Sequence, residues 1–280
     1  MFIGWEAGES ATTAERCVVI GQNACQGAMT GDDNTIIGRE AGYSITSGTR
    51  NTVVGALALD ASTIANDNVA IGYQAGTAVT TGSMNVFVGN AVGNAVSGGA
   101  NNTFMGIDAG TSVTTGANNL FLGHDAGTSN GAGGVMQDGI SNKIVLGDNA
   151  ITTANIQVDW TVHSDRRDKT DIEPFTHGLS WINKLNPVTY RWDNRTDYEN
   201  GTPDGTHKKP KLNLGLIAQD EHEVEKEHGY GDTLDNMLVS DLSDDGENYG
   251  MKYSKLVPIL INAVKELSAE VEQLKSQINN

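Results

Sequence analysis

The sequence predicts a two-part protein: a mainly β, repetitive shaft, followed by an α+β domain that ends in a long helix. Three observations lead to this prediction. A glycine recurs every 17 residues through the first half, the composition changes near residue 160, and the end of the chain repeats apolar residues at helical spacing. We place the two domains at residues 1–160 and 161–280, with the terminal helix at about 254–280.

The repeat of the first domain is defined by its glycines. An apolar pair or near-pair precedes each of them, and an asparagine stands four residues before six consecutive ones. Such regularity indicates stacked structural units. Eight of the glycines are separated by steps of 17 residues, and a ninth follows after a step of 24: Gly4, Gly21, Gly38, Gly55, Gly72, Gly89, Gly106, Gly123 and Gly147.

Each unit reads as a short β-branched or aromatic strand, a tight turn, a second short segment and another turn. One such unit cannot bury its apolar side. The units must therefore stack into a β-solenoid or wind together with copies from other chains. The opening stretch "MFIGWEAG" already fits the repeat, so we expect the chain to be the C-terminal piece of a longer protein.

The repeated asparagines have two explanations, which are ligand contact and a structural ladder or turn cap. The ladder is the better explanation because every coil would need the same side chain. Sugar recognition is expected at irregular places instead, such as the loop 127–139 or the aromatic residues Trp5, Tyr43 and Tyr73. For each aromatic residue alone, packing is the simpler explanation.

Charge and composition exclude several classes of function. The formal net charge of -17 repels phosphate backbones and anionic lipid headgroups, so we expect no nucleic-acid partner and no membrane insertion. No apolar run reaches the roughly 20 residues of a membrane span. Cys17 and Cys25 stand at repeat positions that elsewhere hold Asn and Gly, and they are expected to be free thiols.

The second domain has an ordinary composition. We expect a strand over "ITTANIQVDWTV" (151–162), a helix carrying Leu179, Ile182 and Leu185, and a strand at "VTYRW" (188–192). The segment "LGLIAQDEHEVEKEHG" (214–229) predicts a short strand followed by an acidic, solvated helix. Its two histidines are six residues apart, where a zinc helix has four, so no metal site is expected there.

The end of the chain has the clearest periodicity. Its apolar residues alternate steps of four and three, which is the seam of a coiled coil and needs a partner helix. The alternative is a helix that packs on its own domain. The seam consists of Tyr253, Val257, Leu260, Val264, Leu267, Val271, Leu274 and Ile278.

Two resemblances refine this interpretation. The stretch "NVAIGYQAG" (68–76) resembles the head repeat of trimeric autotransporter adhesins, and phage fibre shafts use the same strand and turn pattern. This resemblance covers roughly residues 1–150 and implies a trimeric β-roll or an interwoven β-helix. The residues themselves support only an elongated, stacked β structure.

Four motifs of the second domain occur together and in order: "SDRRDK" (164–169), "GLSWINKLNPVTYRW" (178–192), "GLIAQD" (215–220) and "YSKLVPILINAVKEL" (253–267). Together they resemble the intramolecular chaperone domain of the endosialidase type, which ends phage tailspikes and tail fibres. The resemblance implies that this domain forms a homotrimer, drives the folding of the shaft before it and then cuts itself off.

Site residues also follow from this resemblance. It implies that Ser164 is the nucleophile, that Lys169 is its general base, and that the scissile bond joins Ser164 to Asp165. Asp168 fills a variable position and receives no role. By residue chemistry alone, "SDRRDK" would be a solvated charged linker, and a spacing of five residues on a straight strand would put the two side chains on opposite faces. A bend or another chain must therefore bring Lys169 to Ser164.

The sequence thus predicts a structural fragment of a phage tail fibre or tailspike, with a self-cleaving serine peptidase that acts once and turns over no external substrate. The expected partners are further copies of the chain and the rest of a fibre or virion, and a host cell-surface glycan is a candidate ligand. Such a protein would be assembled in the host cytoplasm and would need no cofactor. The alternative is a receptor-binding adhesin fibre that keeps its trimerisation domain uncleaved. A polysaccharide-cleaving enzyme is disfavoured because the acids of residues 1–160 are scattered, mostly in turns.

Overall fold

The computed structural model describes residues 1–128, 139–243 and 246–279. The chain divides into two compact units, Met1–Ala154 and Asn155–Asn280.

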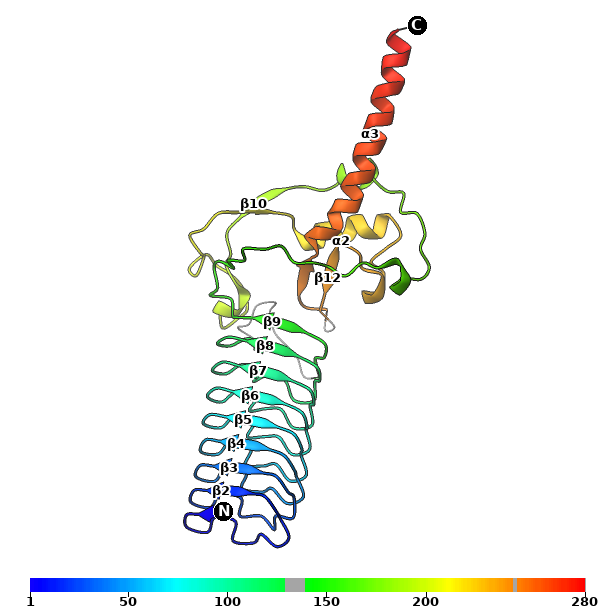
Figure 1. The fold of residues 1–280 in the computed structure, drawn as a ribbon. Helices are drawn as coiled ribbons and strands as arrows, with labels where there is room; N and C mark the ends of the chain where they lie inside the picture. The colour runs from blue at the N-terminus through cyan, green and yellow to red at the C-terminus, as the bar shows by residue number, and fades with distance from the viewer. Residues whose placement is uncertain (129–138, 244–245, 280) are drawn as a thin grey trace. The chain divides into compact units, whose positions relative to one another are not determined.

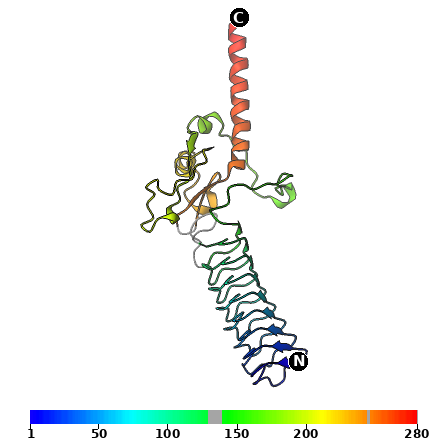
Figure 2. The same cartoon turned by 90° about the vertical axis from the view of Figure 1, so that its left-hand side faces the viewer.

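The first unit is a β-solenoid, as the repeat predicts. Nine short strands form one parallel sheet in chain order (Figures 1 and 2). They are β1 (Phe2–Ile3), β2 (Val18–Ile20), β3 (Thr35–Ile37), β4 (Thr52–Val54), β5 (Val69–Ile71), β6 (Val86–Val88), β7 (Thr103–Met105), β8 (Leu120–Leu122) and β9 (Ile144–Leu146). The register follows the repeat, since Val19 pairs with Ile36. The same register continues across the longer step of 24 residues, where Phe121 pairs with Val145.

The interior of the solenoid is filled by the middle residue of each strand. Successive side chains of a strand point to opposite faces, so this residue faces inward and its two neighbours face outward. Phe104 and Phe121 of this column stack with their ring centroids 4.7 Å apart, whereas the ring of Phe87 is tilted by 45° against that of Phe104. The inward residues of β2 to β9, all at most 5% exposed, are Val19, Ile36, Val53, Ala70, Phe87, Phe104, Phe121 and Val145.

The glycine that ends each strand is required by the close stacking of the coils. Gly72, for example, has φ +135, and a Cβ on it would lie 2.1 Å from the carbonyl oxygen of Gly89 in the next coil. Only glycine accepts both the positive φ and this approach of backbone to backbone. The strict 17-residue spacing of glycine therefore has a steric cause.

The asparagines form the predicted ladder inside the solenoid. From Asn51 onward, each Nδ2 donates to the Oδ1 of the asparagine one coil earlier, as from Asn51 to Asn34 at 3.1 Å, and also to a backbone carbonyl. Cys17 occupies the same column at its start, where its Sγ accepts from the backbone N–H of Asn34 at 3.4 Å. Cys17 and Cys25 are both buried free thiols, as expected.

The expected ligand positions of the shaft have mixed outcomes. Trp5, Tyr43 and Tyr73 are 72%, 40% and 46% exposed, so they do not pack inside the solenoid of the single chain. Most of the loop 127–139 lies outside the described residues.

The second unit combines short helices, one long terminal helix and two-stranded sheets. In chain order it contains η1 (Arg166–Asp168), α1 (Leu179–Ile182), β10 (Val188–Tyr190), η2 (Arg195–Asp197), β11 (Asn213–Gly215), α2 (Ala218–Glu227), η3 (Leu234–Asn236), β12 (Ser240–Leu242), β13 (Tyr249–Met251), η4 (Tyr253–Lys255) and α3 (Leu256–Ile278). The pairs β10–β11 and β12–β13 are antiparallel. The strand expected over residues 151–162 does not form, because this stretch has no pairing partner among the described residues.

The core of this unit lies between α1, α2, β12 and the beginning of α3. It is built from Trp181, Val224, Val239 and Ile259, of which Trp181 is fully buried. The Glu266 carboxylate of α3 accepts a hydrogen bond from the backbone N–H of Leu179 at 2.7 Å, which fixes the N-terminus of α1.

The terminal helix α3 confirms the helix expected at about 254–280, and it is drawn in orange and red in Figure 1. Only Ile259 and Ala263 are buried on it. The predicted seam is exposed in the single chain, between 41% at Val271 and 83% at Ile278. No helix among the described residues is long and apolar enough to cross a membrane.

Candidate self-cleavage site

The candidate site is a tight turn between His163 and Lys169. Residues 166–168 form η1, and the Asp165 side chain caps it by accepting a hydrogen bond from the backbone N–H of Arg167 at 2.9 Å. The backbone N–H of Lys169 then donates to the carbonyl of Arg166 at 3.2 Å, which closes the turn. This capped turn is the bend that the spacing of five residues requires.

The turn brings the two predicted catalytic residues together. Lys169 Nζ lies 2.5 Å from Ser164 Oγ, within one chain. Both side chains are exposed. A serine hydroxyl needs an adjacent base to become a nucleophile, and a lysine amine at hydrogen-bond distance can supply that base in its neutral form.

Two further pairs hold the same turn. The Arg167 guanidinium, together with the Arg167 backbone N–H, lowers the pKa of the Asp165 carboxyl. The imidazole Nε2 of His163 lies 2.8 Å from the Asp168 carboxylate. Sequence reasoning gave Asp168 no role and missed this contact, although the spacing of His163 and Asp168 is the same as that of Ser164 and Lys169.

A buried acidic pair on α2 was also missed. Glu221 is 1% exposed and Glu225 is fully buried, so the expectation of a solvated helix was wrong for this face. The Glu225 carboxylate accepts hydrogen bonds from the backbone N–H groups of Leu238, Val239 and Ser240. The sequence predicts a solvated face for the acids of this helix. No sequence pattern indicates that the backbone N–H groups of residues 238–240 bind Glu225.

The pair is electrostatically coupled. Burial, and then the neighbouring charge of Glu225, raise the pKa of Glu221 to about 7. Trp181 Nε1 donates to Glu221 at 3.2 Å, and His222 Nδ1 lies 3.2 Å from the Ser240 hydroxyl. His228 stacks on Trp181 with ring centroids 4.7 Å apart, so the two histidines of the acidic helix contact different partners. The pair belongs to the core of the domain and lies apart in sequence from the turn at 163–169.

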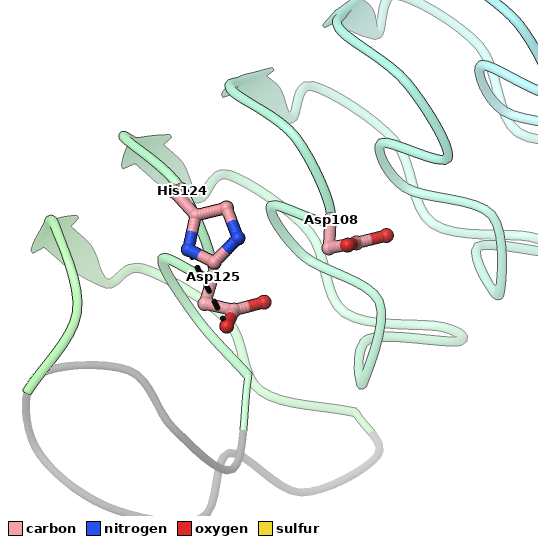
Figure 3. Close-up of side chains that lie close together, drawn as sticks. All are labelled: Asp108, His124 and Asp125. Atoms are coloured by element: carbon pink, nitrogen blue, oxygen red, sulfur yellow. Dashed lines mark ion pairs between the residues drawn. The ribbon is translucent and has the colours of Figure 1, made fainter.

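One cluster of possible metal ligands lies on the solenoid, where Figure 3 shows Asp108, His124 and Asp125 side by side on successive turns. Their ligand atoms lie within 4.8 Å of one another. His124 Nδ1 is also 3.4 Å from the Asp148 carboxylate. The His124 side chain is 60% exposed, so we assign no ion to the cluster.

Comparison with known proteins agrees with this description of the second unit. Residues 164–230 match the family model described as chaperone of endosialidase. No curated protein and no solved structure matches the chain. The matched region begins at Ser164 and includes the turn, α1, β10, β11 and α2. The region that is similar to the endosialidase chaperone thus follows a β-solenoid in the same chain.

Proposed function

We propose that this chain is part of a phage tail fibre or tailspike, whose C-terminal domain trimerises, aligns the β shaft and then releases itself by cutting the bond between Ser164 and Asp165. One observation carries the proposal. Within a region that matches the chaperone of endosialidase, Lys169 Nζ lies 2.5 Å from Ser164 Oγ. Both side chains to which the family resemblance gives the roles of nucleophile and base come from one turn of a single chain, which supports the proposal.

Two exposed apolar surfaces support association of several copies. The seam of α3 is one of them, and a coiled-coil seam that repeats over several heptads is stable only against partner helices. The other is an outward column on the solenoid, to which the last residue of every strand contributes. No member of this column is buried: Ile3, Ile20, Ile37, Val54, Ile71, Val88, Met105, Leu122 and Leu146.

The repeat explains why such a shaft needs a folding aid. Its coils are nearly identical, so chains can pair one coil out of register at little cost. A terminal domain that associates first would align the chains and raise their effective concentration for each other. Cutting afterwards would leave the assembled shaft kinetically trapped, because its chains would lack the device that paired them.

The proposed reaction is a single hydrolysis. The Lys169 amine takes the proton of a Ser164 hydroxyl as that oxygen adds to the scissile carbonyl carbon, and it returns the proton to the leaving nitrogen of Asp165. Water then hydrolyses the ester. The products are a shaft with a carboxylate at Ser164 and a domain with an amine at Asp165, and one water molecule is consumed.

Denaturing mass spectrometry of freshly expressed protein tests the function. We expect two fragments that meet at residues 164 and 165, and an intact chain for Ser164→Ala and for Lys169→Ala. Arg166→Ala, which changes an exposed residue of the same turn, is the matched control and should still be cut. An intact parent chain would refute self-cleavage and favour a receptor-binding fibre that keeps its terminal domain.

A further inference from the structure

The position of the predicted cut constrains which hydroxyl can make it. Ser164 Oγ is joined through its own Cβ and Cα to the carbonyl carbon of the Ser164–Asp165 bond. Attack on that carbon within one residue would close a four-membered lactone ring, whose angles keep the oxygen far from the aligned approach that acyl transfer requires. The hydroxyl is therefore unsuited to cut its own bond.

The alternative within one chain would cut elsewhere. Ser164 Oγ can reach the carbonyl carbon of His163 through a five-membered ring, and that route breaks the bond between His163 and Ser164. The new N-terminus would then be Ser164. A cut between Ser164 and Asp165 thus needs a hydroxyl from outside the residue that is cut.

The structure offers such a hydroxyl on every copy of the chain. The Ser164–Lys169 pair is complete within one chain, and both side chains are exposed. Asp165, on the other side of the scissile bond, is only partly covered. The same turn therefore presents a nucleophile with its base and a bond that another chain can reach.

We propose that the Ser164 hydroxyl of one copy attacks the Ser164 carbonyl carbon of a neighbouring copy. This inference rests on the proposed self-cleavage and deepens it by naming the substrate as a second copy of this chain. Lys169 of the attacking copy takes the hydroxyl proton, and the bond between the neighbour's carbonyl carbon and its Asp165 nitrogen breaks as that nitrogen receives the proton. An ester joins the two chains until water hydrolyses it and restores the hydroxyl.

This arrangement gives the cut a physical trigger. Three copies around a three-fold axis can each attack the next, so every chain is both nucleophile and substrate. A general base must be neutral, and exclusion of water favours a neutral amine. Lys169 is exposed in the single chain, and a second chain lying over the turn would exclude that water. The domain is then cut off only after the chains have met.

Mixed assemblies test the proposal. The parent chain and the Ser164→Ala chain are co-expressed with different N-terminal affinity tags, and assemblies that contain both are isolated by two successive purifications. Denaturing mass spectrometry then shows which shafts are cut. We expect the Ser164→Ala shaft to be cut after position 164 in the mixed assemblies, and to stay intact when that chain is expressed alone.

Two controls sharpen the result. A Lys169→Ala chain keeps its own serine and should also be cut by a parent neighbour, which excludes an effect of the Ser164→Ala substitution on the bond that is cut. A mixture of Ser164→Ala and Lys169→Ala chains should remain uncut, because the 2.5 Å contact places both catalytic groups on one chain.

The outcomes separate this inference from the function on which it rests. A parent chain that is not cut when expressed alone refutes self-cleavage itself. Cutting between copies is refuted if the parent chain is cut while its Ser164→Ala neighbour in the same assembly stays intact. A new N-terminus at Ser164 would also refute it, and so would the cutting of a chain that sediments as a monomer.

Discussion

His163 Nε2 lies 2.8 Å from the Asp168 carboxylate, in a pair that runs beside the contact between Ser164 and Lys169. The two pairs have the same spacing and join the same ends of η1. The contact between His163 and Asp168 therefore limits how far Ser164 and Lys169 can separate.

We predict that Asp168→Asn slows self-cleavage without abolishing it. The pair is exposed, with 81% and 63% of the two side chains accessible, and exposed pairs are worth about 0.2–1 kcal/mol. The cleavage rate should fall roughly 1.4- to five-fold, measured as the loss of full-length chain with time in cell-free synthesis. The exchanged double variant His163→Asp/Asp168→His should recover much of the rate. Glu173→Gln, an exposed acid outside the turn, is the control, and an equal loss in both would contradict a role in positioning.

The asparagine ladder leads to a prediction about the stability of the shaft. Asn85 donates through Nδ2 to Asn68 Oδ1 and to the Gly99 carbonyl, and its own Oδ1 accepts from Asn102. Asn85→Ala leaves several of these buried groups without partners, each at a cost of about 1–3 kcal/mol. The denaturant midpoint of the shaft should fall clearly, measured in the Ser164→Ala background, whereas the exposed Asn90→Ala should change it little. Equal midpoints for both variants would show that the ladder contributes no stability.

Much of the first unit could be predicted because a local sequence pattern, repeated every 17 residues, determines its fold. The 17-residue spacing predicts the strands and the asparagine ladder, and the parallel register found in the structure follows the same spacing. The second unit was harder. Contact between Ser164 and Lys169 depends on a turn capped by Asp165, which residue spacing cannot show.

The prediction that the acidic face of α2 is solvated failed for a different reason. Sequence reasoning assigns Glu221 and Glu225 to solvent because charged side chains are seldom buried without partners. The partners here are a tryptophan and three backbone N–H groups that follow far along the chain. Such partners exist only in the folded domain and leave no local pattern in the sequence.

The buried pair predicts a pH dependence of the second unit. The pKa of Glu221 is raised to about 7, above its ordinary 4.5, so the folded domain favours the protonated form. The stabilisation is fully present below about pH 4.5 and is lost as the pH rises through 7, up to about 3 kcal/mol. The free energy of unfolding of the second unit, followed by tryptophan fluorescence in the Ser164→Ala background, should therefore fall over this range. Glu221→Gln should flatten the curve, while Glu223→Gln, an exposed neighbour, should leave it unchanged. A parent curve that rises from pH 4.5 to 7 would contradict the assignment.

The exposed seam of α3 gives the last prediction, which separates assembly from folding. Leu267 is 52% exposed and lies beyond the part of α3 that packs on its own domain, so Leu267→Glu should leave the fold of one chain intact. It should prevent association, because a charge at a seam position would be buried against the partner helices. Sedimentation in the Ser164→Ala background is expected to show three chains for the parent sequence and one for Leu267→Glu.

In the cleavable background Leu267→Glu should also remain uncut, because each hydroxyl would lack a neighbouring bond to attack. Ser268→Glu adds the same charge at an exposed position off the seam and should assemble and cut like the parent. A Leu267→Glu chain that is monomeric and still cut would show that assembly is not required for cleavage.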